Sequence, residues 1–326
     1  MEKLRLSIAL DEYDHTRDVM SGRVPVEGID LIAMNLQIEE IFYRNTLYHE
    51  WDVSELSMGK YCSLRSQGDD TFTAIPVFVS RQFRHSMIYV RDDGKITRPE
   101  QLAGKRVGVP EWAQTATVYS RGFLAHNAGV KLESIDWVQA GLHQAGRVEK
   151  VKLKLPQGLK LRSVPESTLN DMLLAGEIDA ILTARAPRGL GQGIARLIRD
   201  YRPAEEEYYR KTGIYPIMHV VVLRSEVLAR HPWVAGNLMK AFEEAKRRSY
   251  ARLDEIGVSA VPLAWLADYV GQMKSLFGED FFPYGVEKNR RTLDAFLQYG
   301  HEQGVFHRRM QPEELFPKQV LTTFKV

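Results

Sequence analysis

The chain has 326 residues, of which 44% are hydrophobic and 26% are charged, proportions typical of a folded globular protein. Its 44 basic and 42 acidic side chains leave a net charge of +2, which gives no electrostatic basis for binding nucleic acid or an anionic membrane. No apolar stretch approaches the roughly 18 residues that a membrane span needs. Because a single core stops growing near roughly 250–300 residues, we expect two lobes.

The N-terminal segment and the cysteine count indicate the compartment. Arg5 interrupts the first apolar run and Asp11 ends it, so the sequence predicts no secretion signal and a cytoplasmic protein. The single cysteine, Cys62, cannot form an internal disulfide, and we expect it to be a small buried apolar residue.

The N-terminal part of the chain alternates strand and helix patterns. Apolar, β-rich runs bounded by turn residues predict strands, and the spacing of Ile38, Ile41 and Phe42 predicts a helix. In chain order, the expected elements are a strand at 4–10, a strand at 30–34, a helix at 38–48, a strand at 53–58, a helix at 59–65, and strands at 72–79 and 87–90.

A second lobe is expected to begin at the turn signal Asp92-Asp93-Gly94. The alternation of basic and apolar residues over 148–164, with Pro156-Gln157-Gly158 in the middle, predicts a hairpin. The other elements expected here are helices at 98–102, 115–126 and 166–175 and strands at 106–109, 135–138 and 178–182. The remainder is expected to be helical at 204–211, 233–253, 262–277 and 288–302, with one strand at 217–223. Such β–α alternation implies doubly wound sheets.

Two motifs resemble those of type II periplasmic solute-binding proteins. The first is LAGKRVGV at 102–109, which resembles the entry to their second lobe, and the second is LAGEIDA at 174–180, which resembles the return from it. The resemblance implies a two-lobed α/β fold with mixed sheets and a ligand cleft between the lobes. The chain would cross between lobes near 86–92 and 183–190, giving one lobe from 1–88 plus 190–326 and another from 89–189.

A narrower resemblance rests on IPVFVSRQFRHS at 75–86, LDEYD at 10–14 and GIYPIMH at 213–219. These segments resemble the 4,5-dihydroxyphthalate decarboxylase family, which uses this fold without a signal peptide. The resemblance implies a lyase of aromatic catabolism that removes one carboxylate of a dihydroxylated phthalate, giving a protocatechuate-like product and CO2. Its partner would be a small aromatic carboxylate, and the chemistry requires no organic cofactor.

The expected acid–base groups are His15, His85, His219 and Glu111, because ligands of α/β sheets bind beyond the carboxyl ends of strands. An imidazole exchanges protons near neutral pH. We expect one of His15 and His85 to protonate the ring carbon, while the other histidine or Glu111 takes the phenolic proton. Each of the three histidines could instead be a hydrogen-bonded structural residue, and Glu111 could cap a helix.

Further side chains at the strand ends are expected to bind the substrate. Guanidinium groups bind carboxylates through two parallel hydrogen bonds, aromatic rings form walls, and groups at helix starts hold anions. The candidates are Tyr13, Asp14, Ser57, Lys60, Arg81, Arg84, Trp112, Thr115, Arg185 and Arg188. A metal is left open, since a catechol chelates divalent ions and Asp14, His15, Glu111 and His219 carry donor atoms without forming a recognised motif.

Two other functions remain alternatives at this point. The same fold serves non-catalytic binding or sensor proteins for aromatic or small carboxylates, and it serves biosynthetic enzymes of menaquinone or thiamine-precursor synthesis. Trp233, Trp265, Phe281 and Phe282 could form the face of a homo-oligomer or pack against the first lobe.

Overall fold

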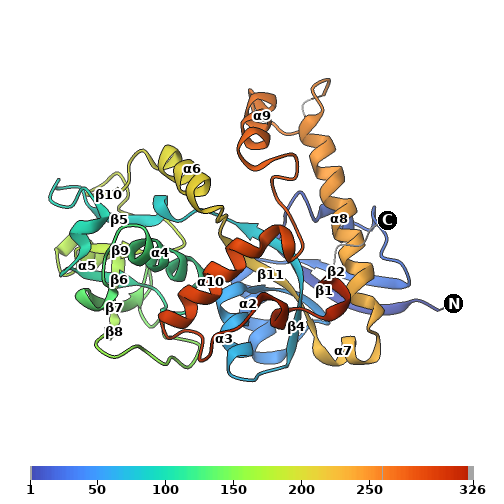
Figure 1. The fold of residues 1–326 in the computed structure, drawn as a ribbon, viewed down its shortest axis with the longest axis horizontal. Helices are drawn as coiled ribbons and strands as arrows, with labels where there is room; N and C mark the ends of the chain where they lie inside the picture. Colours follow the sequence, from blue (N-terminus) through green and yellow to red (C-terminus); the bar gives the residue numbers. More distant parts are fainter. Residues whose placement is uncertain (1, 259, 322–326) are drawn as a thin grey trace.

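The computed structural model describes residues 2–258 and 260–321, which form two α/β lobes with one sheet each (Figure 1). The strand order of the first sheet is β2 (Ile29–Asn35), β1 (Leu4–Leu10), β3 (Val53–Ser57), β11 (Ile217–Arg224) and β4 (Phe72–Arg81). Neighbours in this sheet are parallel except that β11 runs antiparallel to β3 and β4. The helices of this lobe are α1 (Arg17–Met20), α2 (Ile38–Tyr48), α3 (Met58–Ser66), α7 (Ser225–Arg230), α8 (Trp233–Asp254), α9 (Leu266–Phe277) and α10 (Arg290–Glu302).

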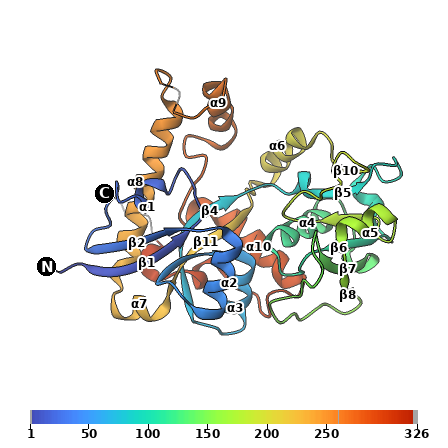
Figure 2. The same ribbon diagram turned by 180° about the vertical axis from the view of Figure 1, so that it is seen from behind.

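The second sheet has the order β10 (Ile194–Arg196), β5 (Ile88–Arg91), β9 (Ala180–Leu182), β6 (Arg106–Val109), β7 (Asp136–Gly141) and β8 (Lys160–Thr168). The strands from β9 to β8 are parallel, whereas β5 and β10 are antiparallel additions. Its helices are α4 (Thr115–His126) and α5 (Leu169–Ala175), and α6 (Tyr201–Thr212) follows between the lobes (Figure 2). The two-lobed α/β fold predicted from the sequence is confirmed.

Short 3₁₀ turns connect these elements. They are η1 (His85–Met87), η2 (Pro99–Leu102), η3 (Leu132–Ser134), η4 (Glu287–Asn289), η5 (Pro312–Leu315) and η6 (Lys318–Val320).

The two motifs that carried the fold resemblance contact each other in the second lobe. The guanidinium of Arg106, in the first motif, donates to Asp179 in the second at 3.1 Å, and the Arg106 backbone N–H donates to the same carboxylate at 3.0 Å. Thr168 caps α5 by accepting from the N–H of Asp171, and Gly176 ends the helix with φ at 78°. The second motif is therefore a helix end that returns the chain to a strand beside β6.

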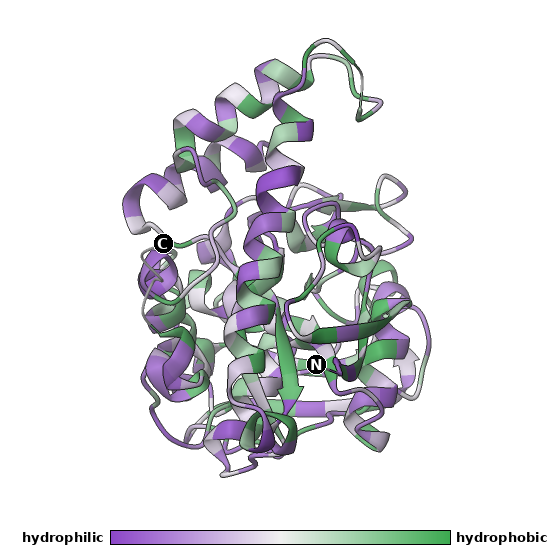
Figure 3. Ribbon diagram, turned by 90° about the vertical axis from the view of Figure 1, so that its right-hand side faces the viewer, coloured by the Kyte–Doolittle hydropathy of each residue, from purple (hydrophilic) through white to green (hydrophobic). Residues whose placement is uncertain are grey.

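One hydrophobic core extends through both lobes, because α4 of the second lobe packs against α10 of the first. The rings of Tyr119 and Phe296 stack with centroids 4.7 Å apart, and Gly122 lies directly against Tyr299. Cys62 is fully buried in this core, as expected from the sequence. Figure 3 shows apolar segments concentrated in the strands, while the helices alternate between polar and apolar residues.

One expectation about the elements was wrong. Residues 148–159 form no hairpin; their apolar side chains pack on the core, and the N–H of Lys154 donates to the carbonyl of Gly304. Lys160–Thr168 is instead a strand parallel to β7. Ile194–Arg196 pairs with β5 and so belongs to the second sheet.

The end of α8 and all of α9 project from the first lobe as an arm (Figure 1). Of the residues of α9, which the structure describes in full, Val270 alone is buried. Trp265, at the start of α9, is 80% exposed. Phe281 and Phe282 pack within the chain, against Tyr250 and His15 respectively. Among the described residues, no helix has the length and apolar character needed to cross a bilayer.

Candidate functional site

The carboxylate of Glu55, in the middle of β3, is fully buried and is the centre of a polar cluster at the edge of the first sheet. Its Oε2 accepts the backbone N–H of Asp11 at 3.1 Å. Its Oε1 accepts the hydroxyl of Tyr13 at 2.5 Å and lies 2.6 Å from Nδ1 of His219. A buried charge is unfavourable unless it is paired and hydrogen-bonded, and these three contacts satisfy it.

The topology of the sheet explains this convergence. Tyr13 follows the carboxyl end of β1, and His219 lies at the start of the antiparallel strand β11, paired with Ser57 at the end of β3. All three segments therefore reach the same edge. Burial, and then the charge of Glu55, raises the pKa of Tyr13, which keeps its hydroxyl a proton donor to that carboxylate.

His219 has one ring nitrogen occupied and one available. Because Glu55 accepts from Nδ1, the neutral ring carries its proton there and leaves a lone pair on Nε2. Nε2 makes no hydrogen bond to any residue that the structure describes, and the side chain is 21% exposed. The ring of Phe42 packs edge-on against the imidazole, with centroids 5.1 Å apart. These two contacts fix the orientation of the imidazole, as the function of a general base would require.

The second lobe meets this edge at two points. The hydroxyls of Ser57 and Thr115 lie 2.9 Å apart, and the Thr115 hydroxyl also accepts the N–H of Gly59 at 2.9 Å. Beyond β9, Nη2 of Arg185 lies 3.2 Å from Oε1 of Glu39 on α2. Ser57, Thr115 and Arg185 therefore lie at the contact between the lobes, and their role in binding substrate stays a prediction.

A charged cluster lies on the same side of the contact. Glu111 pairs with Arg147 at 2.7 Å and with Lys150 at 3.5 Å. Burial, followed by the nearby charge of Lys150, lowers the pKa of Lys60 to about 8. Glu111 is thus engaged in ion pairs in this structure, apart from the Glu55 cluster.

His85 is buried and His15 is half-buried, and both lie outside the Glu55 cluster. His15 lies 2.5 Å from the hydroxyl of Tyr284 and 3.1 Å from the carbonyl of Val79, and burial lowers its pKa to about 4. His85 is enclosed by Phe123 and Tyr208, with centroids 4.1 and 4.7 Å away. Burial lowers the pKa of His85 to about 4 as well, and neither of its ring nitrogens has a partner among the described residues.

The placement of these two histidines does not support the proton-transfer roles expected from the sequence. His15 is a hydrogen-bonded structural residue, and His85 occupies an aromatic cage. Of the three candidate histidines, His219 alone joins the Glu55 cluster in the described structure.

The buried arginines have structural contacts. Arg81 donates to the carbonyls of Tyr215 and Pro283 and to the Asn289 side chain, and burial lowers its pKa to about 10. Arg84 donates to Sδ of Met218 at 3.2 Å and to the carbonyl of Ala184 at 3.5 Å.

The remaining candidates lie elsewhere. Asp14 accepts from Ser249 and Arg252 of α8, at 2.5 and 3.0 Å. Trp112 is fully buried, and its indole N–H donates to the carbonyl of Gln303. Arg188 is exposed, near Asp171. None of the three contacts the Glu55 cluster within the described residues.

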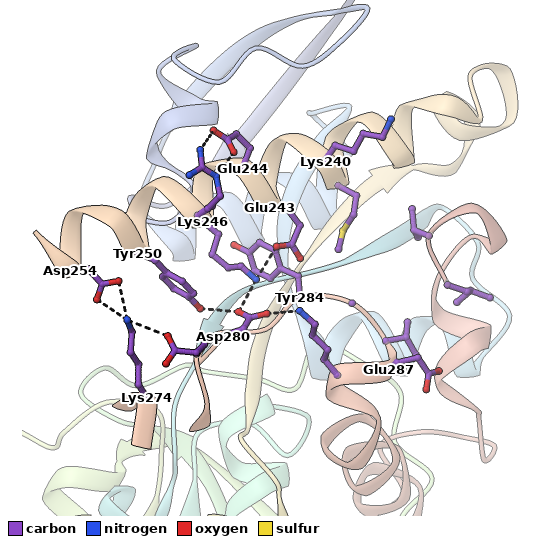
Figure 4. Close-up of a pocket in the computed structure, with 18 residues that line it drawn as sticks. Lys240, Glu243, Glu244, Lys246, Tyr250, Asp254, Lys274, Asp280, Tyr284 and Glu287 are labelled. Carbon is purple, nitrogen blue, oxygen red and sulfur yellow. Dashed lines mark hydrogen bonds and ion pairs between the residues drawn. The ribbon is translucent and has the colours of Figure 1, made fainter. Parts of the chain in front are cut away.

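The larger of two cavities, about 980 Å³, lies between α8, α9 and residues 279–288 (Figure 4). There Asp280 accepts from Lys246 at 3.0 Å, from the hydroxyl of Tyr250 at 3.0 Å and from Lys288 at 2.7 Å. The smaller cavity, about 290 Å³, lies beside η1 and α6. Neither cavity is lined by Glu55 or His219, so the Glu55 cluster lies outside both.

The donor atoms considered for a metal are dispersed. Asp14 and His15 face α8 and Tyr284, Glu111 pairs with cations, and His219 pairs with Glu55. Among the described residues, no three His, Cys, Asp or Glu side chains are grouped so as to hold an ion.

The fold and this edge define the class of protein: a two-lobed, periplasmic-binding-protein-like chain with a carboxylate–histidine pair at the edge of its first sheet. In structure, it is similar to the aliphatic sulphonate binding protein SsuA from Escherichia coli, at 12% identity and a TM-score of 0.50, over 100% of this chain and 95% of that one. It is also similar to a variant of DszB in complex with biphenyl-2-sulfinic acid, at 14% identity and a TM-score of 0.53, over 97% of both chains. These likenesses show the fold.

Sequence comparison shows the family. The chain is 40% identical to the 4,5-dihydroxyphthalate decarboxylase of Comamonas testosteroni over 330 aligned positions, covering 100% of both proteins. It is 41% identical to the enzyme of the same name from Pseudomonas putida over 214 positions, 64% of this chain and 83% of that one. No protein-family model matches the chain. The chain belongs to the 4,5-dihydroxyphthalate decarboxylase family, and it is a carboxy-lyase.

Sequence reasoning missed Glu55, Phe42 and Glu39. Glu55 did leave a signal, because a lone acidic residue within the otherwise uncharged run Val53–Ser57 is unusual for a buried strand. The contacts of α2 left no signal in the sequence, because they depend on how the helix packs against a strand more than 170 positions away.

Proposed function

We propose that the chain decarboxylates 4,5-dihydroxyphthalate to protocatechuate and CO2, with His219 as the general base and Glu55 as its charged support. The observation that supports this most is that Nε2 of His219 has no partner among the described residues, on a side chain that is 21% exposed and pairs with a buried carboxylate. Family membership favours this lyase over a binding or sensor protein.

The chemistry follows from the substrate. Each ring carboxylate is para to one hydroxyl, so removing the proton of that hydroxyl moves electron density onto the carbon that bears the carboxylate. Nε2 of His219 takes this proton, and the negative charge of Glu55 stabilises the imidazolium that results. The carbon takes up a proton from water as CO2 leaves, and His219 returns the phenolic proton, so each turnover consumes one proton.

Substrate entry requires the lobe edges to separate. The contacts of Ser57 with Thr115 and of Glu39 with Arg185 hold them together here, which fits a closed form. The moving bodies would be the predicted lobes, 1–88 plus 190–326 and 89–189, and the pairing of Ile194–Arg196 with β5 supports a second crossing after Arg196. The cytoplasmic location and a homo-oligomeric state stay predictions.

The test is CO2 release from 4,5-dihydroxyphthalate by the purified protein and by His219→Asn. Removing a general base should lower kcat by about 10²–10⁴-fold. His126→Asn is the matched control, because His126 also pairs with a glutamate, Glu302, at 2.7 Å but lies on the surface. It should retain normal turnover.

The outcomes separate two claims. No CO2 from the wild-type protein at saturating substrate would end the proposed function. Turnover by His219→Asn within a few-fold of wild type would leave the function standing and remove His219 from it.

A further inference from the structure

The ion pair between Arg185 and Glu39 joins the two lobes beside the proposed site. Nη2 of Arg185 lies 3.2 Å from Oε1 of Glu39, and the side chains are 63% and 54% exposed. Glu39 lies three positions before Phe42 on α2, and residues with this spacing share one face of a helix. Since Phe42 packs on His219, the pair borders the general base.

We propose that Arg185 anchors the carboxylate that the substrate retains, and that Glu39 occupies this guanidinium when substrate is absent. The inference rests on the proposed function and adds the group that recognises the second carboxylate. Glu39 and the substrate present the same chemical group to Arg185. The side chain of Glu39 is thus an internal competitor for the anion site.

The geometry favours replacement of Glu39. Glu39 contacts Nη2 of Arg185 through Oε1 at 3.2 Å, whereas a free carboxylate can use two parallel N–H groups of a guanidinium. Exposed ion pairs are weak, so little is lost when this one opens. Glu39 also lies in the first turn of α2, where the helix dipole favours negative charge, and an incoming carboxylate preserves that interaction.

Arg185 differs in this respect from the other arginines expected to bind substrate. Arg81 and Arg84 are buried and donate to backbone carbonyls or to sulfur, and Arg188 is exposed near Asp171. Of these four arginines, Arg185 alone forms an ion pair with a carboxylate of α2 in the described structure.

The experiment compares Glu39→Gln and Arg185→Gln, using phthalate as a competitive inhibitor. Phthalate has both carboxylates and no hydroxyl, so its inhibition constant measures anion recognition without turnover. Removing the competitor should lower this constant about two- to fivefold, the range of a weak exposed pair. Removing the anchor should raise it about tenfold to a hundredfold. In the double variant, Glu39→Gln should not lower the inhibition constant, because the anchor for which Glu39 competes is gone.

Glu40→Gln is the matched control. Glu40 neighbours Glu39 in the first turn of α2 but pairs with Arg44 of the same helix at 2.5 Å. The inhibition constant of this variant should equal that of the wild type.

Two results would overturn the inference. If Glu39→Gln weakens phthalate binding, the pair is a latch that holds the lobes together and not a competitor. If Arg185→Gln leaves the constant unchanged, Arg185 is not the anchor. Phthalate binding that follows the expected pattern without CO2 release from 4,5-dihydroxyphthalate would count against the proposed function alone.

Discussion

At the scale of single residues, three histidines that each lie at or near the end of a strand have three different environments. His219 faces a buried carboxylate, and its Nε2 has no partner in the part of the chain that the structure describes. His15 is hydrogen-bonded through both ring nitrogens, and His85 is enclosed by aromatic rings. All three lie at or near strand ends, as the sequence indicated. Which side of the sheet edge each ring faces depends on tertiary packing, which no local pattern contains.

His85 should make the protein sensitive to acid without contributing to catalysis. Its folded-state pKa of about 4 lies below the ordinary value of 6.5. The unfolded chain therefore binds the proton more readily between these values, so stability is full above about pH 6.5 and falls as the pH drops toward 4. At about pH 5 the loss is about 2 kcal/mol.

His85→Leu should remove this loss. Denaturant unfolding at about pH 7 and about pH 5 should show a smaller difference between the two free energies than in the wild type. Comparing the two pH values cancels any constant effect of repacking the cage. The variant should keep kcat within a few-fold, whereas a catalytic His85 would lower it by about 10²–10⁴-fold.

At the scale of elements, two helical glycines have opposite surroundings. A Cβ on Gly122 of α4 would lie 2.3 Å from Cδ2 of Tyr299 on α10, whereas a Cβ on Gly271 of α9 would meet no atom within 4 Å. Gly122→Ala should therefore force the two helices apart and destabilise the protein by about 1–3 kcal/mol. Gly271→Ala should stabilise it by about 0.5–1 kcal/mol, through helix propensity alone.

Thermal unfolding of the two variants provides the measurement, and each serves as the control for the other. A Gly122→Ala variant as stable as the wild type would mean that α4 and α10 do not pack as closely as the structure indicates.

The sequence predicted most elements of the fold and few of their contacts. Apolar runs and helical spacing are local signals, which is why β1, α2 and α4 were predicted with the bounds observed. The residues before β8 show that alternation of polar and apolar residues does not by itself identify a strand. Alternating lysine and apolar residues also suit an irregular segment with one side on the core, as at 148–159. The Glu55 cluster joins β1, β3 and β11, and only the folded sheet brings these strands together.

At the scale of the whole molecule, the lobes share one core, and this should make them unfold together. Arg121 is fully buried, stacks on Trp112 and donates to Gln303 at 2.8 Å. Separating the lobes would expose this arginine together with Tyr119 and Phe296. Calorimetry should therefore record a single transition whose calorimetric and van't Hoff enthalpies agree. Two resolved transitions would show that the lobes are independent.

Because Cys62 is buried, the rate of its chemical modification reports how often the core opens. Cys62 is the only thiol of the chain, it lies fully inside the shared core, and burial raises its pKa, which suppresses the reactive thiolate. An alkylating reagent can modify it only when that core opens. With reagent in excess, the rate of modification will follow core opening and become independent of reagent concentration once labelling outpaces reclosure. Ligands that hold the lobes together will slow that reaction, so mass spectrometry of one sulfur can report substrate binding without measuring turnover.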